Sequence, residues 1–229
     1  LNEIVLDASY HVDDGQTREI QKDGQPLRLV LDDAYNQISG DGTLLNEVEL
    51  SGGAVIRPGD SPGTLTIANA TTLGPGSRYE WEINDVSGDP GTNPGWDLLS
   101  VESNLEFTAT ELQPVVLQVV SLNGSNLPGL VDNLQTSVDY RWLIAEANAI
   151  TGFDSRAIDV DVSALRPFYQ HVRATDFRLS VEGNALYLHG RVVPEPASCT
   201  LLLAFAAWLL IAASGSRGQS RLIFRRTAN

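Results

Sequence analysis

Three oxygen-bearing side chains in one turn-rich segment are the first candidates for chemistry in this sequence. In "GDPGTNPGWD", Asp89, Asn93 and Asp97 follow one another at intervals of four residues. Carboxylate and amide oxygens are the ligands that Ca²⁺ prefers in proteins. The alternative is turn capping, in which such side chains bond to nearby backbone amides. Because neither an EF-hand pattern nor a nonapeptide calcium repeat is present, the segment favours turn capping over a calcium site.

Signatures of catalysis or of cofactor binding are absent from the rest of the chain. His11, His171 and His189 lie far apart, without the spacing of metal ligands. The sequence has no nucleophile elbow, phosphate-binding loop or dinucleotide fingerprint. We therefore expect a protein that is not an enzyme and that has no cofactor, although paired carboxylates among the 29 acidic residues stay an open alternative.

Aromatic residues define a second class of function. Trp81, Trp96, Tyr140 and Trp142 would form a platform for sugar rings if they were exposed in a shallow groove. A surface carbohydrate-binding module, or an enzyme acting on polysaccharide, is therefore the alternative to a purely structural role.

Charge is distributed unevenly along the chain. Four of the 15 basic residues, Arg217, Arg221, Arg225 and Arg226, lie beyond Glu195, the last acidic residue. The rest of the chain therefore carries 11 basic against 29 acidic residues, a net charge of −18. A body of this charge repels phosphates, so we expect no nucleic acid partner.

The C-terminal tail joins a stiff peptide to a short apolar segment. Pro194 and Pro196 flank Glu195 and favour an extended conformation, which also suits a plain linker. Residues 199–213, "CTLLLAFAAWLLIAA", carry no charge, and with small flanking residues the segment 197–215 has 19 residues. A helix of that length spans roughly 28 Å, close to the apolar core of a bilayer. The segment is apolar on every side, which predicts a single membrane helix followed by a cytoplasmic basic flank.

This combination resembles the PEP-CTERM sorting signal of Gram-negative bacterial surface proteins, over residues 194–226. The resemblance implies that Pro194, Glu195 and Pro196 are recognised by an exosortase, a membrane-embedded transpeptidase that removes the helix. It also implies that Arg217, Arg221, Arg225 and Arg226 form the basic flank that stays in the cytoplasm. The protein would then pass from the inner membrane to the cell surface or the extracellular matrix. A permanent single-pass anchor, with the prolines as a stalk, is the alternative.

The body before the tail has the pattern of an all-β protein. Turn clusters such as "KDGQP", "RPGDSPG" and "LGPGS" separate short runs rich in β-branched and aromatic residues. The runs expected to form strands are residues 27–31, 78–83, 115–120, 140–145 and 177–181.

A short pattern recurs among these runs. An apolar residue is followed two positions later by Gly or Asn, and six positions later by another apolar residue. Strand, tight turn, strand is the logic of a β-solenoid, although a β-sandwich uses similar pieces. The examples are Ile38/Gly40/Leu44, Leu50/Gly52/Ile56, Ile67/Asn69/Leu73 and Val181/Gly183/Tyr187, with Val101/Ser103/Phe107 as a degenerate fifth.

Residues 38–83 also resemble the repeat region of autotransporter-like and PEP-CTERM surface proteins. In that family "PGDSPGTLTI" marks a turn between the strands of a right-handed β-helix, which implies a structural role. The turn residues are Pro58, Gly59, Asp60, Ser61, Pro62 and Gly63. We expect Gly59 and Gly63 to permit the corners, Asp60 and Ser61 to bond back to the chain, and Leu65 and Ile67 to point inward.

The sequence therefore predicts an all-β extracellular body over residues 1–190, as a short right-handed β-solenoid or, alternatively, a β-sandwich. Residues 191–229 are predicted to hold the sorting signal, with one transmembrane helix. The expected function is that of an exported structural protein of the cell surface or extracellular matrix, with roles in adhesion or biofilm implied only by the family. The expected partners are the exosortase, the membrane and extracellular polysaccharide. Because the chain starts at Leu1 and has no Met, we expect an initiator and any signal peptide to be missing.

Overall fold

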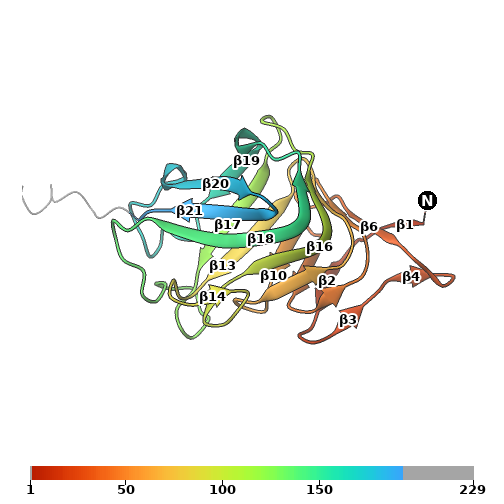
Figure 1. The fold of residues 1–229 in the computed structure, drawn as a ribbon, viewed down its shortest axis with the longest axis horizontal. Helices are drawn as coiled ribbons and strands as arrows, with labels where there is room; N and C mark the ends of the chain where they lie inside the picture. Colours follow the sequence, from red (N-terminus) through yellow and green to blue (C-terminus); the bar gives the residue numbers. More distant parts are fainter. Residues whose placement is uncertain (1, 193–229) are drawn as a thin grey trace, which may run out of the picture. The chain divides into compact units, whose positions relative to one another are not determined.

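The computed structural model describes residues 2–192, whose regular secondary structure is almost entirely β-strand (Figure 1). The all-β prediction is confirmed. The described residues all belong to one compact unit, Leu1–Val193. The predicted membrane helix (199–213), the proline motif and the arginine flank all lie outside the described residues. Within residues 2–192, no helix is long and apolar enough to cross a membrane.

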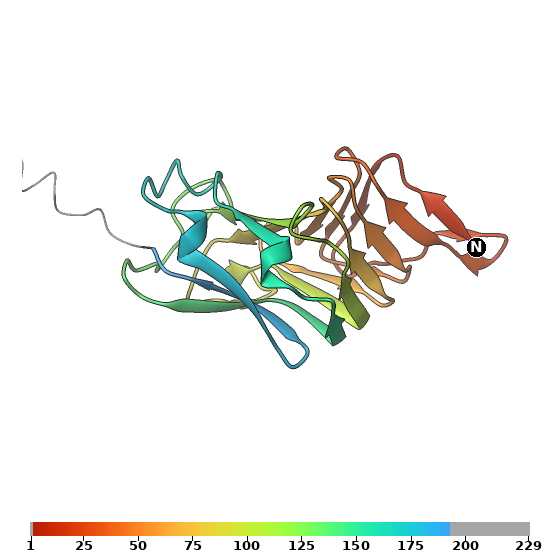
Figure 2. The same cartoon turned by 90° about the horizontal axis from the view of Figure 1, so that it is seen from above.

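Most strands belong to three ladders in which every neighbouring pair is parallel. Figure 2 shows the strands stacked side by side along the long axis of this unit. The first ladder contains β2 (Ser9–Val12), β7 (Gln37–Gly40), β10 (Val55–Pro58), β13 (Arg78–Ile83), β17 (Val115–Ser121) and β19 (Ile158–Asp161).

The second and third ladders share their last two strands, because β16 (Leu98–Phe107) and β18 (Tyr140–Thr151) are long enough to serve both. The second ladder consists of β3 (Thr17–Arg18), β8 (Thr43–Leu44), β11 (Thr64–Ile67), residues 98–101 of β16 and residues 145–147 of β18. The third consists of β1 (Glu3–Val5), β6 (Arg28–Leu31), β9 (Val48–Leu50), β12 (Thr71–Leu73), residues 104–107 of β16 and residues 149–151 of β18.

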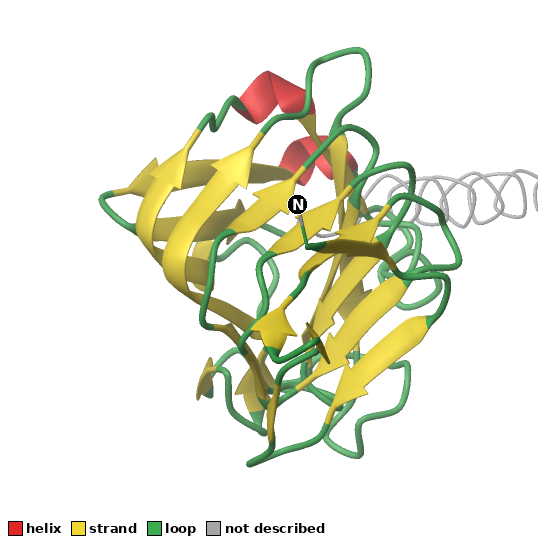
Figure 3. Ribbon diagram, turned by 90° about the vertical axis from the view of Figure 1, so that its right-hand side faces the viewer, coloured by secondary structure: helices red, strands yellow, loops and turns green. Residues whose placement is uncertain are grey.

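The chain visits the ladders in a fixed order. From β7 it passes to β8 and then β9, and the next three strands, β10, β11 and β12, pair with these in the same order. We call each such set of consecutive strands a rung. Seen from the end that carries the N-terminus, the sheets face one another across a shared interior (Figure 3).

Strand register places similar apolar side chains on top of one another in this interior. In the third ladder Leu31 pairs with Leu50, Leu50 with Leu73, and Leu73 with Phe107, and none of the four is more than 6% exposed. Burying an aliphatic side chain of this size contributes about 1.5–3 kcal/mol. Each rung is therefore stabilised by the apolar residues of the rung before it.

The predicted repeat coincides with corners of this path. The patterns at 38–44, 50–56 and 67–73 each run from a strand of one ladder, through a turn, to a strand of the next ladder. The pattern at 101–107 lies within β16 where its register with β18 shifts. The pattern at 181–187 was a wrong prediction: β20 (Phe177–Glu182) and β21 (Ala185–Gly190) form an antiparallel hairpin there, because Gly183 reverses the chain with φ of +64°.

The predicted strands at 27–31, 78–83, 115–120, 140–145 and 177–181 are confirmed as β6, β13, β17, β18 and β20. Three additions interrupt the ladders. β4 (Gln21–Lys22) and β5 (Gln25–Pro26) form a small hairpin, and β14 (Asp89–Pro90) and β15 (Gly95–Trp96) form an excursion next to β13. At the C-terminal end, the β20–β21 hairpin pairs antiparallel with β18, beside two 3-10 helices, η1 (Ser155–Ala157) and η2 (Ala174–Asp176).

Candidate functional site

The turn predicted at residues 58–63 and the candidate ligand Asp97 meet in the structure. Pro58 is the last residue of β10, and Thr64 is the first residue of β11. Gly59 and Ser61 have φ of +82° and +85°, so the reversal rests on these two residues. Beyond the turn, Leu65 and Ile67 are fully buried, as predicted. We call the turn together with Arg57, Glu82 and Asp97 the carboxylate corner.

Asp97 is fully buried and forms hydrogen bonds to two separate segments of the chain. Its Oδ1 accepts a hydrogen bond from the Gly63 amide at 3.0 Å, and its Oδ2 accepts one from the Glu82 amide at 2.7 Å. Its own amide donates to the Glu82 carbonyl at 3.0 Å, and its carbonyl accepts from the Trp81 indole Nε1 at 2.8 Å. One side chain thus ties the 58–63 turn to strand β13 and to the start of β16.

Two glycines allow Asp97 to approach this closely. A Cβ on Gly59 would lie 2.6 Å from Asp97 Oδ1, and a Cβ on Gly63 would lie 3.0 Å from Gly59 Cα. The expected role of Gly59 at the corner is confirmed. Asp60 does not cap the turn as expected, since its carboxylate lies 3.5 Å from His11 Nε2.

Glu82 and Arg57 complete the carboxylate corner. Arg57 Nη2 donates to Glu82 Oε1 at 2.8 Å, and Arg57 Nε lies 3.2 Å from Glu80 Oε1. The Glu82 side chain is only 4% exposed, and its second oxygen, Oε2, is buried without a hydrogen-bond partner among the described residues. Leaving such an oxygen ionised and unpaired is costly.

Burial changes the protonation of both carboxyl groups. It raises the pKa of Glu82, and the charge of Glu80 adds to this effect although Arg57 opposes it. Burial, followed by the negative charge of Glu82, raises the pKa of Asp97 well above its usual range, against the two amide bonds that favour ionisation. The corner is therefore an acidic cluster that holds protons more tightly than exposed carboxylates do.

Sequence reasoning did not single out Glu82 or Arg57. In "RYEWEI" the alternation places Tyr79 and Trp81 inside and Glu82 outside, as for an ordinary solvated face. Glu82 is buried because the chain leaves after β13 and returns at Asp97 alongside it. No local pattern predicts the return point of a 13-residue excursion (84–96).

The three weak calcium candidates do not converge. Asp97 uses both carboxylate oxygens on backbone amides, the role that turn capping predicts. Asn93 Oδ1 accepts from Asn84 Nδ2 at 2.8 Å, while Asp89 is exposed in β14. Among residues 2–192 no group of three or more His, Cys, Asp or Glu side chains is arranged to hold a metal ion.

The aromatic candidates for sugar binding are mostly in the core. Trp81, Trp96 and Trp142 are 0%, 8% and 5% exposed, so they do not form the exposed platform that the carbohydrate-binding alternative requires. Trp81 and Trp142 pack against each other with ring centroids 5.8 Å apart. Tyr140 is half-buried and stacks on Trp142 at 5.2 Å. They are large inward-facing residues that close the C-terminal end of the core.

Comparison with known proteins adds no name to this site. Neither a scan against protein families, nor a search of curated proteins, nor a search of solved structures found a match. The carboxylate corner is suited to holding three segments of backbone together, since its carboxylates are buried and directed at the chain itself.

Proposed function

We propose that this chain is an exported, non-enzymatic structural protein of the bacterial cell surface, delivered by a C-terminal sorting signal of the PEP-CTERM kind. The observation that carries the proposal is the position of the motif. The compact unit ends at Val193, and Pro194-Glu195-Pro196 begins at the next residue. A membrane-embedded enzyme needs such a peptide outside the folded body, and prolines at this spacing favour an extended conformation.

The apolar segment and the arginines after the motif support the same proposal. A neutral run of membrane-spanning length followed by four arginines has the asymmetry of a segment with its C-terminal end in the cytoplasm. The acidic body would then lie outside. Its processing would release it to the surface or the extracellular matrix.

We further propose that the body is a short right-handed β-solenoid. Three all-parallel ladders visited in a repeating order support this assignment over a β-sandwich, whose sheets are antiparallel. In this solenoid, the buried carboxylate corner stabilises the contact between neighbouring rungs. A passive stacked body of this kind suits display or adhesion, with extracellular polysaccharide as a partner.

The alternative, a surface carbohydrate-binding module or polysaccharide-acting enzyme, has lost the feature that favoured it. Three of its four aromatic candidates are buried in the core. A glycan array with no binding, and no hydrolysis of common polysaccharides, would leave the structural role standing.

The sorting proposal is tested by fractionating hosts that have or lack an exosortase. We expect the chain in the membrane fraction without the enzyme and in the released fraction with it. The variant Pro194→Ala/Glu195→Ala/Pro196→Ala should stay in the membrane in both hosts, whereas the control Pro167→Ala, at an exposed proline of the body, should be released normally. Release of the triple variant at the normal rate would refute recognition of this motif.

A further inference from the structure

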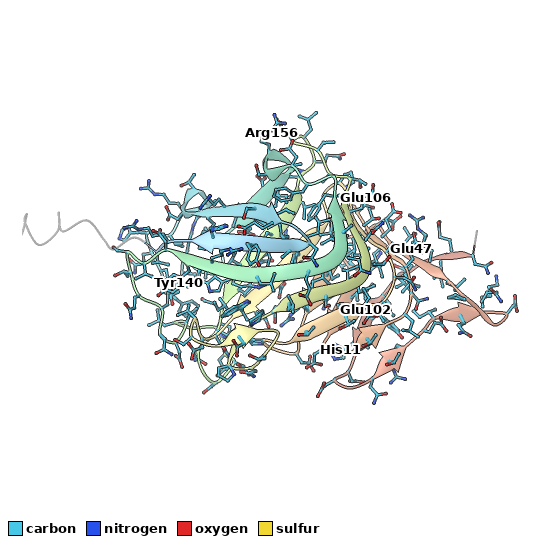
Figure 4. All side chains as sticks on the ribbon, in the orientation of Figure 1. His11, Glu47, Glu102, Glu106, Tyr140 and Arg156 are labelled. Carbon is cyan, nitrogen blue, oxygen red and sulfur yellow. The ribbon has the colours of Figure 1, made fainter. Side chains whose placement is uncertain are left out.

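The charge of the described body is strongly polarised along the chain. Residues 1–139 contain 22 acidic and five basic residues, whereas residues 140–192 contain six of each. The second segment comprises β18, β19, the β20–β21 hairpin and the two 3-10 helices, which we call the cap. Figure 4 shows Tyr140 at one end of β18, in the cap, and Glu47, Glu102 and His11 in the acidic remainder.

Cations gather in one row across the cap. Strand register pairs Arg141 of β18 with His189 of β21, and His189 with Arg178 of β20, so three basic side chains are neighbours on the same face. Arg141 already has two partners, because it forms an ion pair with Glu182 at 2.6 Å and lies over the Tyr187 ring. Arg178 is exposed, and among residues 2–192 no carboxylate lies within ion-pair distance of it.

The row borders a pocket of about 130 Å³. Arg178, His189 and Arg191 line it together with Tyr140. Two carboxylates also line the pocket, and each already has a partner. Asp139 lies 3.6 Å from Arg191, and Asp176 accepts a hydrogen bond from the Arg173 backbone amide at the start of η2. Arg191 is therefore already paired, and Arg178 is the cation of this pocket that has no ion-pair partner among residues 2–192 and can donate to an incoming oxyanion beside the Tyr140 hydroxyl.

The His189 imidazole lies beside Arg178 and Arg141 in this row. Partial burial, and then the charges of Arg178 and Arg141, lower the pKa of its imidazole, although Glu182 acts in the opposite direction. Its Nε2 also lies 2.8 Å from Ser180 Oγ. An anion bound beside this ring would favour the imidazolium form, so binding would raise the pKa of His189 and would strengthen as the pH falls.

We propose that this pocket binds the phosphate group of anionic membrane lipids. The occupant follows from the proposed function, on which this inference rests. Only five residues lie between Arg191 and Ala197, where the apolar segment begins, and the six residue steps span about 20 Å at most. Lipid phosphates within that reach attract exposed arginines where the two come within a Debye length, about 10 Å, whereas the remainder of the body, with its 22 acidic residues, is repelled.

The test uses the full chain, labelled in its three histidines, first in an uncharged detergent. Titration with glycerol phosphate, the soluble lipid headgroup fragment, should raise the pKa of His189 in NMR spectra and leave His11 unchanged. Arg178→Gln should weaken the binding at least ~10-fold. Arg18→Gln, at an exposed arginine of β3, is the matched control and should have no effect. An unchanged His189, or a shift of equal strength in the Arg178 variant, would overturn the site.

The second arm compares nanodiscs of phosphatidylglycerol with nanodiscs of phosphatidylcholine. The pKa of His189 should be higher in the anionic discs, and Arg178→Gln should abolish the difference. A response to glycerol phosphate without a difference between the lipids would overturn the membrane as the occupant. Co-elution of the chain with the discs reports separately on the membrane segment, so a failure of the proposed anchoring is distinguishable from a failure of the pocket.

Discussion

Asparagines at equivalent corners of two successive rungs provide a matched experiment on what holds the rungs together. Asn46 lies between β8 and β9, and Asn69 lies at the same position between β11 and β12, because Leu44 pairs with Ile67 and Val48 with Thr71. Asn46 has no solvent exposure, whereas Asn69 is exposed.

The hydrogen bonds of the two side chains differ accordingly. Asn46 Oδ1 accepts from the Ile20 amide at 2.8 Å, and Asn46 Nδ2 donates to the carbonyls of Ile20 and Leu27 at 2.8 Å each. Asn69 makes one bond, from Nδ2 to the Leu45 carbonyl at 2.6 Å. Asn46→Ala strands the partly buried Ile20 amide and the buried Leu27 carbonyl, at about 1–3 kcal/mol for each group, so we expect a loss of about 2–6 kcal/mol. Asn69→Ala should cost less than about 1 kcal/mol.

Urea denaturation of both variants gives the two changes in the free energy of unfolding. Hydrogen exchange should also accelerate at the Ile20 amide in Asn46→Ala, while amides of the cap keep their protection. If Asn46→Ala costs no more than Asn69→Ala, the rungs are held by apolar stacking alone and the reasoning is refuted.

Three further predictions concern the core and the carboxylate corner. Gly59→Ala should cost more than about 2 kcal/mol in thermal unfolding, because φ is +82° and the new Cβ meets Asp97. The control Gly15→Ala, at φ of +65° in open space, should cost about 1 kcal/mol, and equal losses would contradict the close approach. Since the folded state raises the pKa of Glu82 and Asp97, it binds more protons than the unfolded state. Stability should therefore fall as the pH rises from about 4 through the raised folded values, and Glu82→Gln should flatten that profile in urea midpoints. Thr71→Val should raise the free energy of unfolding by about 1 kcal/mol, because Oγ1 is buried without a partner among the described residues, and a loss would reveal a hidden partner.

The strands of the body were predictable because their signal is local. Alternation in "RYEWEI" and the short apolar runs gave β13 and its neighbours with bounds within a few residues. The recurring apolar–Gly/Asn–apolar pattern located several corners for the same reason. Its irregular intervals have a physical cause, since the matches fall on different corners of the path and excursions such as 84–96 add length between rungs.

The carboxylate corner was not predictable, because its geometry depends on distant segments. Asp97 was selected for its spacing from Asp89 and Asn93, yet its bonding partners are Gly63 and Glu82. Pairing of that kind depends on which rung the chain rejoins. The pattern at Val181 gave a wrong prediction because a glycine turn has the same sequence signature in a solenoid corner and in an antiparallel hairpin. The burial of the tryptophans likewise follows from their inward register, which composition alone does not reveal.

The central claim is that an exosortase recognises Pro194-Glu195-Pro196 on an exported protein and removes the apolar segment that follows. The most direct measurement is the intact mass of the chain recovered from the surface of a host that has an exosortase, beside the same host without the enzyme. We predict a surface chain that ends close to Pro196 and has lost the apolar segment, and a full-length membrane-bound chain without the enzyme. A full-length chain that stays in the membrane of both hosts would contradict the claim and make the tail a permanent anchor.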